Sequence, residues 1–244
     1  MRTQILAHRG ASKLAPENTM PAFELAYFQE AEGIETDVQL TKDNIPVLIH
    51  DEHVKRTTDG AGYIKDLAFH QLKELDAGSW FSQKFSGTRI PSLEEFLHWA
   101  QNKRLHVNIE LKNNKIDYKN IESIVYEMIL HYQLLDRTTI STFNSNSLKR
   151  MRDFDNNLSV ALLTSKRNKN IVAYSKTIGA DAIHVKYRSL SKPLIEHSHQ
   201  ENMAIRVFTV NRFAHIMKCF NYGCDGIITD IPGEARLYRD LFEK

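Results

Sequence analysis

Short apolar runs rich in β-branched residues alternate with segments of helical periodicity along the 244 residues of this chain. The pattern predicts eight strands, at Thr3–Ala7, Gly33–Val38, Leu105–Leu111, Thr138–Thr142, Leu158–Leu163, Asp181–Val185, Ala204–Thr209 and Gly226–Thr229. After the second strand, the Asp43-Asn44 turn leads into another extended run, Pro46–Ile49, which predicts a hairpin-like continuation.

A helix is predicted after each of the eight strands. The first is expected to start at Thr19, with Pro21 in its first turn. Ser92-Leu93-Glu94-Glu95 is a capping box and begins a helix that runs to about residue 102. Apolar residues from Ile121 to Leu135 also follow helical spacing. The remaining predicted helices are Ser145–Phe154, Asn170–Ile178, Ser191–Gln200, Phe213–Tyr222 and Gly233–Phe242.

Regular alternation of strands and helices indicates parallel βαβ units. Eight units in a chain of this length predict a closed (β/α)8 TIM barrel, with residues 1–244 as a single domain. A doubly wound open sheet is the alternative, but no glycine-rich phosphate loop follows the first strand. The segment at about 51–90 is too long for an ordinary loop, so we expect a small insertion between strand 2 and helix 2, over the carboxyl end of the barrel.

Charge and composition exclude several other classes of protein. The chain has 32 Lys and Arg against 30 Asp and Glu, a net charge of +2, and 42% hydrophobic residues, which argues against disorder and nucleic-acid binding. No apolar run reaches the ~18–20 residues of a membrane span, and the first residues do not read as a secretory signal. We therefore expect no stable membrane insertion and a cytoplasmic location. Cys219 and Cys224 lack zinc-site spacing and are predicted to be free buried thiols.

Three carboxylates follow the predicted strands in a suggestive pattern. Glu35 and Asp37 are two residues apart and therefore share one face of the second strand, while Glu110 lies near the end of the next barrel strand. At one barrel mouth their charges would repel, so a bound cation is the simplest explanation. Oxygen ligands alone favour one Mg²⁺ or Ca²⁺ over Zn²⁺. The alternative at this point is that each carboxylate is a solvated loop residue.

Two histidines and two cationic side chains occupy similar positions, namely His8, Arg9, His50 and Lys112. A metal with two cations would neutralise phosphate oxygens, and the histidines would move protons, so the set suits a phosphoryl substrate. Single histidines are more often surface or satisfied core groups, and we interpret three others in that way, His106, His184 and His215.

Six sequence blocks in the same order resemble the glycerophosphodiester phosphodiesterase family, in its short bacterial cytosolic form. Each block alone is modest, but together they cover essentially the whole chain. The blocks are Ala7–Ala11 with Ala15–Thr19, Gly33–Val38 with Leu40–Asp43, Pro46–Asp51, Asn108–Lys112, Val207–Asn211 and Asp225–Pro232.

The resemblance implies a metal-dependent hydrolase of lipid and glycerol metabolism, which splits deacylated phospholipids into sn-glycerol 3-phosphate and an alcohol. It also implies a role for each candidate residue: Glu35, Asp37 and Glu110 as ligands of one Mg²⁺ or Ca²⁺, His8 and His50 as the acid–base pair, and Arg9 and Lys112 on the phosphate.

Three further residues are expected in the substrate pocket. Glu17 would contact the glycerol hydroxyls or Arg9, and Phe143 and Phe208 would pack on the glycerol or the head group; ordinary barrel packing is the alternative for both aromatics. Family members often carry Trp where this chain has Phe208. The expected partner is a small diester, with a homo-oligomer left open. Two rival functions are a phospholipase D-like enzyme acting on lysolipids and a non-catalytic phosphate-binding barrel.

Overall fold

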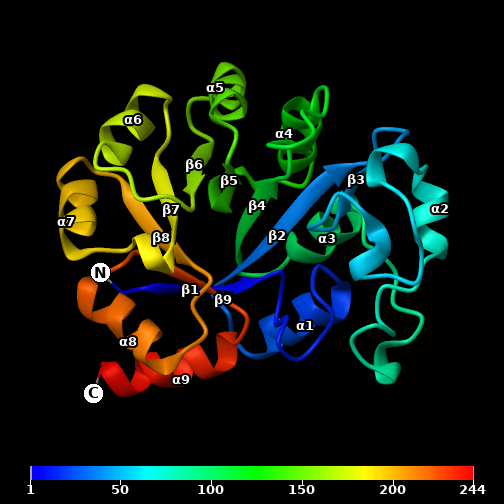
Figure 1. Cartoon of the computed structure of the whole chain (residues 1–244), viewed down its shortest axis with the longest axis horizontal. Coiled ribbons are helices and arrows are strands. Elements are labelled where there is room, and N and C mark those ends of the chain that lie inside the picture. The colour runs from blue at the N-terminus through cyan, green and yellow to red at the C-terminus, as the bar shows by residue number, and fades with distance from the viewer. Residues whose placement is uncertain (1, 244) are drawn as a thin grey trace.

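Nine strands form one sheet in the computed structural model, which describes residues 2–243. Eight of them are parallel and close into a barrel because β1 pairs with both β2 and β9, so the predicted TIM barrel is confirmed and the open sheet is wrong (Figure 1). The ninth strand, β3, pairs antiparallel with β2. The strands are β1 Gln4–His8, β2 Gly33–Leu40, β3 Pro46–Leu48, β4 His106–Leu111, β5 Thr138–Thr142, β6 Ser159–Thr164, β7 Ala182–Lys186, β8 Ala204–Phe208 and β9 Gly226–Thr229.

Helices surround the barrel and cover the outer face of its strands (Figure 1). They are α1 Met20–Phe28, α2 Phe69–Glu74, α3 Leu93–Ala100, α4 Ile121–His131, α5 Ser145–Phe154, α6 Ile171–Thr177, α7 Lys192–Gln200, α8 Phe213–Tyr222 and α9 Pro232–Phe242. Five short 3₁₀ turns complete the regular structure: η1 Val54–Arg56, η2 Ile64–Asp66, η3 Gln83–Phe85, η4 Leu135–Arg137 and η5 Tyr187–Ser189.

Alternation along the strands separates the apolar core from the polar barrel interior. On β2, Ile34 and Val38 are fully buried in the core between barrel and helices, whereas the intervening Glu35 and Asp37 point to the other face. The outer core includes Phe23 of α1 and Phe96 of α3, whose ring centroids are 4.7 Å apart. A buried phenylalanine of this kind contributes about 3–5 kcal/mol relative to alanine. Apolar packing between the strands and the helices therefore stabilises a barrel whose interior is polar.

Two predicted helix boundaries illustrate what local sequence determines. The capping box of α3 is confirmed, because Ser92 Oγ accepts from the Glu95 amide at 3.1 Å and Glu95 Oε2 accepts from the Ser92 amide at 2.7 Å. The predicted continuation of α4 to Leu135 is wrong. The helix ends at His131, since Gln133 adopts a left-handed φ of 55° that breaks the helical path, and Leu135 begins η4 instead.

The segment 51–90 packs against β3 and carries its own small core. Val54, Ile64 and Leu72 are fully buried there against Val47 of β3. Asp76 orders the far loop of this segment, because its carboxylate accepts hydrogen bonds from three backbone amides, those of Gly78, Ser79 and Gly87, at 2.7–2.8 Å. The hydrogen bonds favour the charged form and hold the pKa of Asp76 well below its usual range.

Both cysteines, Cys219 and Cys224, are free and buried, as predicted. None of the helices formed by residues 2–243 combines the length and apolarity that a bilayer span requires.

Candidate active site

Three buried carboxylates meet at the carboxyl end of the barrel strands. Glu35 and Asp37 come from β2 and Glu110 from β4, where Asp37 and Glu110 are direct partners in the parallel register. One oxygen from each side chain lies within 4.8 Å of the others. The spacing of two along β2 and the pairing of neighbouring parallel strands thus bring together residues 75 positions apart, as the sequence pattern predicts.

Two cations lie against these carboxylates without balancing them. Arg9 Nε is 3.1 Å from Asp37 Oδ2, and Lys112 Nζ is 2.8 Å from Glu110 Oε1 and 3.7 Å from Asp37 Oδ1. Three carboxylates against two cations leave one negative charge in a buried site. Burying such a charge is costly unless another cation joins it or a carboxyl group takes up a proton.

The ionisation of the trio reflects this excess of negative charge. Burial raises the pKa of Glu110 to about 7 and, together with the charge of Asp37, raises the pKa of Glu35 well above its usual range. For Asp37 burial acts in the same direction, but Arg9 and Lys112 outweigh it and hold the pKa of this carboxyl well below its usual range. Asp37 Oδ1 is buried and accepts no hydrogen bond from residues 2–243. The donor set therefore fits a hard divalent cation with oxygen ligands.

Asn18 orients Asp37, a role that the sequence did not predict. Its Nδ2 donates to Asp37 Oδ2 at 2.9 Å, and its Oδ1 accepts from Thr36 Oγ1 at 2.8 Å and from the Asp37 amide at 3.3 Å. Thr19, the next residue, caps the first helix. The left-handed φ of 55° at Asn18, which asparagine tolerates better than most residues, turns the side chain into the barrel instead.

His8 forms a hydrogen-bonded pair with Asp230, from the opposite end of the chain. His8 Nδ1 lies 2.6 Å from Asp230 Oδ1, and Asp230 also accepts from Ser12 Oγ and from the side-chain Nδ2 of Asn211. A carboxylate on Nδ1 fixes the proton there and leaves Nε2 free to exchange a proton with a ligand. Asp230 lies in a block quoted above, yet its sequence position gives no sign of a partner 222 residues away.

His50 forms the same kind of pair with its neighbour Asp51, at 2.6 Å between Nδ1 and Oδ1. Arg56 of the insertion donates to the Asp51 carboxylate and so holds this pair in place. Burial lowers the pKa of His50; the charge of Asp37 opposes this change, while Arg9 and Lys112 reinforce it. Arg56, from η1, is a second site residue that the sequence pattern did not single out.

Glu17 contacts Arg9, one of the two alternatives expected for it. Its Oε1 accepts from Arg9 Nη1 at 2.7 Å and from Arg56 Nη2 at 2.8 Å. Both arginines hold the pKa of this carboxyl below its usual range despite its burial. The salt bridges connect the β1 loop, the insertion and, through Arg9, the acidic trio.

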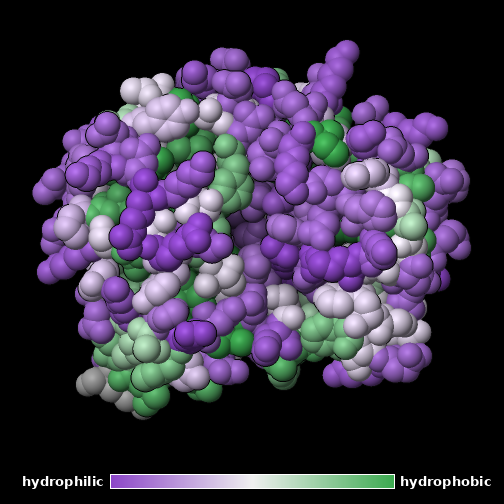
Figure 2. Space-filling view, viewed as in Figure 1, coloured by the Kyte–Doolittle hydropathy of each residue, from purple (hydrophilic) through white to green (hydrophobic). Residues whose placement is uncertain are grey.

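Two aromatic rings lie across the mouth from one another. Phe143 follows β5 and Phe208 ends β8, and their ring centroids are 6.2 Å apart at an edge-to-face angle of 88°. Beneath them, Phe208 helps to line a cavity of about 20 Å³ together with His8, Glu35, Glu110 and buried His184. Hydrophilic side chains gather around the hollow at the centre of the barrel (Figure 2). One apolar ring, two histidines and two of the three carboxylates therefore line one small cavity.

This combination of a TIM barrel, a buried acidic trio with residual negative charge and two histidine–carboxylate pairs is typical of hydrolases that act on phosphate esters with a divalent cation. The model of the glycerophosphoryl diester phosphodiesterase family matches residues 8–234. The chain belongs to this family, and its class is therefore that of a phosphoric diester hydrolase.

Named relatives cover almost the entire chain. It is 40% identical over 241 residues to a glycerophosphodiester phosphodiesterase of Bacillus altitudinis, covering 98% of each chain. It is 39% identical over 232 residues to one from Caldanaerobacter subterraneus subsp. tengcongensis, covering 95% of this chain and 96% of that one. A solved phosphodiesterase of Oleispira antarctica, in complex with the product sn-glycerol-3-phosphate, superposes with a TM-score of 0.93 at 28% identity, covering 98% of this chain and 97% of that one.

Proposed function

We propose that the protein hydrolyses glycerophosphodiesters to sn-glycerol 3-phosphate and a free alcohol, with one divalent cation, Mg²⁺ or Ca²⁺, as cofactor. The observation that carries the proposal is the buried trio of Glu35, Asp37 and Glu110. Arg9 and Lys112 balance only two of its three negative charges. A divalent cation would give this site a net charge of +1. A phosphodiester, which carries one negative charge, would then complete the balance.

In this proposal Arg9 and Lys112 hold the phosphate. Both cations are mostly buried beside the carboxylates, so a bound diester exchanges water for fixed positive charge that also stabilises the charge developing on the phosphoryl oxygens. The cation supplies further stabilisation of that charge when bound. Because Asn18 and Glu17 already hold Asp37 and Arg9 in position, little reorganisation is required at the moment of reaction.

His50 and His8 exchange the protons in this proposal. The lowered pKa of His50 keeps its ring neutral near pH 7, which suits a base that takes the proton of the attacking 2-hydroxyl of the glycerol. Attack by this hydroxyl releases the alcohol and forms a cyclic phosphate, which water then opens to sn-glycerol 3-phosphate. A cation on the nearby trio adds positive charge and acts in the same direction. His8, on the other side of the trio, gives a proton to the leaving alkoxide. Asp51 and Asp230 hold both rings with Nδ1 engaged and Nε2 directed to the substrate.

Glu17, Phe143 and Phe208 complete the substrate pocket in this proposal. The two rings offer an apolar wall for the carbon atoms of glycerol, while Glu17 acts by holding Arg9. We further propose that residues 1–244 work as a single catalytic unit in the cytoplasm, with 51–90 as its insertion. The contact of Arg56 with Asp51 and Glu17 supports a shared site for barrel and insertion. The two free thiols suit a reducing compartment.

Release of sn-glycerol 3-phosphate from a panel of diesters tests the proposal. The panel contains glycerophosphocholine, glycerophosphoethanolamine and glycerophosphoglycerol, each with Mg²⁺, with Ca²⁺ and with a chelator. His8→Ala and His50→Ala are compared with His131→Ala, a matched change at an exposed histidine of α4. We expect release that depends on the metal, falls by about 10²- to 10⁴-fold in the two site variants and persists in the control. Absence of release from every diester by folded, metal-loaded protein would refute the proposed function.

A further inference from the structure

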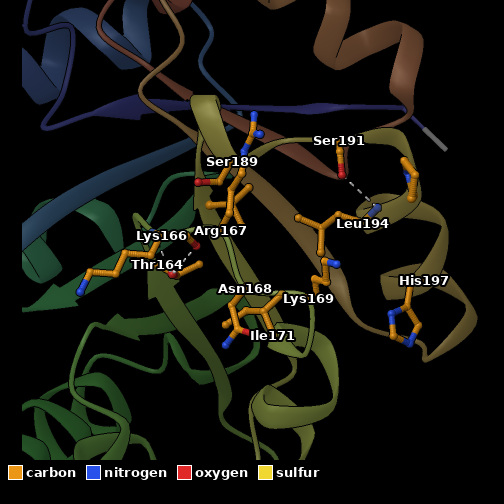
Figure 3. A pocket seen from close by; sticks show the side chains of 12 residues that line it. Thr164, Lys166, Arg167, Asn168, Lys169, Ile171, Ser189, Ser191, Leu194 and His197 are labelled. Carbon is orange, nitrogen blue, oxygen red and sulfur yellow. Dashed lines mark hydrogen bonds between the residues drawn. The ribbon is translucent and has the colours of Figure 1, made fainter.

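A cleft of about 540 Å³ between the loops that follow β6 and β7 has three basic side chains in its lining, beside apolar residues such as Ile171 and Leu194. Lys166, Arg167 and Lys169 belong to the first loop, and Arg188 of η5 lies in the second and lines an adjoining hollow with Lys166 and Arg167. We refer to these four residues as the cationic cleft. Figure 3 shows Lys166 and Lys169 extending to opposite sides of their loop, so the positive charge extends over both hollows.

No carboxylate balances the cationic cleft. Residues 164–197 contain seven Lys and Arg and two acidic residues, Asp181, which pairs with Arg152 at the amino end of β7, and Glu196, which pairs with Lys192. Within the part of the chain that the structure describes, none of the four cleft cations forms an ion pair. A chain with a net charge of only +2 thus concentrates uncompensated positive charge in one place.

Backbone carbonyl groups hold the two arginines of the cationic cleft in place without neutralising their charge. Arg167 donates through Nε at 3.1 Å and Nη2 at 2.9 Å to the carbonyl oxygen of Arg188, and Arg188 donates to the carbonyl oxygen of Ser165 at 3.4 Å. These bonds join the two loops through Arg167 and Arg188, and Lys166 and Lys169 extend from this frame as exposed side chains. A carbonyl group carries no charge, and the positive field remains available to a ligand.

The cationic cleft lies on the catalytic end of the barrel. Its two loops leave β6 and β7 at their carboxyl ends, the same end at which Glu35 and Glu110 meet. Lys186, the last residue of β7, is exposed, pairs with Phe208 in the strand register and lies two residues after inward-facing His184, on the same face of the strand. One side of the mouth, β1 to β4, is therefore suited to a cation and the scissile phosphate, and the other side, β6 to β7, is suited to a second anion.

We propose that the cationic cleft binds a second phosphate group carried on the alcohol part of the diester, so that the preferred substrates are glycerophosphodiesters whose leaving alcohol is itself phosphorylated. This inference rests on the proposed function. A phosphate monoester carries up to two negative charges and several acceptor oxygens, which match multiple lysine and arginine donors better than a neutral or cationic head group does.

A pair of substrates that differ by one phosphate tests the inference. Glycerophosphoglycerol is compared with the same diester phosphorylated at the far end of its leaving glycerol, and the ratio of kcat/KM for the two is measured with Mg²⁺ at low salt. We expect a ratio above one in the natural protein. In Lys166→Gln/Lys169→Gln it should fall by about tenfold, since each exposed lysine facing a dianion changes the ratio by about three- to fivefold.

Matched variants separate this effect from general changes. Lys149→Gln/Lys176→Gln removes the same net charge from α5 and α6, away from the cationic cleft, and should keep the natural ratio. Charge reversal in Lys166→Glu/Lys169→Glu should bring the ratio below one, and about 0.5 M salt should reduce it in the natural protein. Thermal melting establishes that each variant is folded.

The outcomes distinguish the inference from the function beneath it. A ratio of one in the natural protein, or a ratio that is the same in the cleft and control variants, overturns the inference while the hydrolysis of glycerophosphoglycerol still supports the proposed function. Failure to release sn-glycerol 3-phosphate from either substrate contradicts the proposed function itself.

Discussion

Replacing Asp230 by Asn tests whether His8 depends on a carboxylate partner. One oxygen of Asp230 accepts from His8 Nδ1 and Ser12 Oγ, and the other accepts from the side-chain Nδ2 of Asn211. All three partners present a donor, and an asparagine can offer only one acceptor oxygen. If that oxygen stays with Asn211, the new amide group faces His8 and donates to Nδ1, so Nδ1 can no longer hold a proton and the doubly protonated ring that acts as the acid is disfavoured.

The size of the effect follows from the hydrogen bond that is lost. A charge-assisted bond of this kind is worth about 1.5–3 kcal/mol, and each 1.36 kcal/mol in the barrier is tenfold in rate. Loss of the correct tautomer adds to this effect. We therefore expect kcat of Asp230→Asn to fall by about 10²-fold or more, with small changes in KM and in cation affinity, because Asp230 contacts neither the acidic trio nor Arg9 and Lys112.

Initial rates of glycerol 3-phosphate release over a range of diester concentrations separate kcat from KM. Ser12→Ala is the matched control, since it removes a bond to the same Asp230 oxygen without changing the histidine ring, and it should cost less than about fivefold. A folded Asp230→Asn protein that keeps kcat within threefold of the natural value would refute the assigned role of this pair.

Three further predictions follow from the buried charges and the insertion. Glu35→Gln removes one charge of the trio, so the metal-free variant should melt about 2–4 °C above the metal-free natural protein at pH 8, whereas Mg²⁺ should raise the melting temperature of the natural protein and not that of the variant. A variant that melts below the natural protein would contradict the excess of negative charge. Because the metal-free pKa of Glu110 is about 7 and that of Glu35 is also raised, protons compete with the cation at low pH, so calorimetry should show that Mg²⁺ affinity rises with pH through about 7 and that binding releases protons. Constant affinity from pH 5.5 to 8 would oppose this reasoning. Asp76→Asn should weaken the insertion by about 1–2 kcal/mol, measured as faster amide exchange confined to 51–90, with Asp66→Asn as an exposed control; exchange that stays at the natural rate would show that the carboxylate is not the organising group.

The barrel and the acidic trio could be predicted from the sequence because both follow from periodicity. Strands alternating with helices imply parallel strands, and parallel strands bring their carboxyl ends together. Spacing by two then places Glu35 and Asp37 on one face, and the register of β2 with β4 adds Glu110. No knowledge of loop paths or side-chain rotamers is required for these steps.

The partners that orient these groups could not be predicted, because they depend on loops and on chain reversal. Asp230 reaches His8 only because β9 closes the barrel against β1, and Arg56 reaches Asp51 only because the insertion folds back over β2. Asn18 reaches Asp37 only because its left-handed backbone turns its side chain away from the helix that Thr19 begins. The end of α4 at His131 was missed for the same reason, since a left-handed residue interrupts an apolar pattern that continues beyond it.

The central claim is that one divalent cation on Glu35, Asp37 and Glu110 is required for turnover, and a metal titration tests it most directly. Chelator-stripped protein is titrated with Mg²⁺, and cation binding and glycerol 3-phosphate release are followed on the same sample. The account predicts that activity rises from a negligible level in parallel with the filling of one site per chain, and that Asp37→Asn abolishes both. Full activity in the stripped protein, or binding that saturates without any gain in rate, would contradict it.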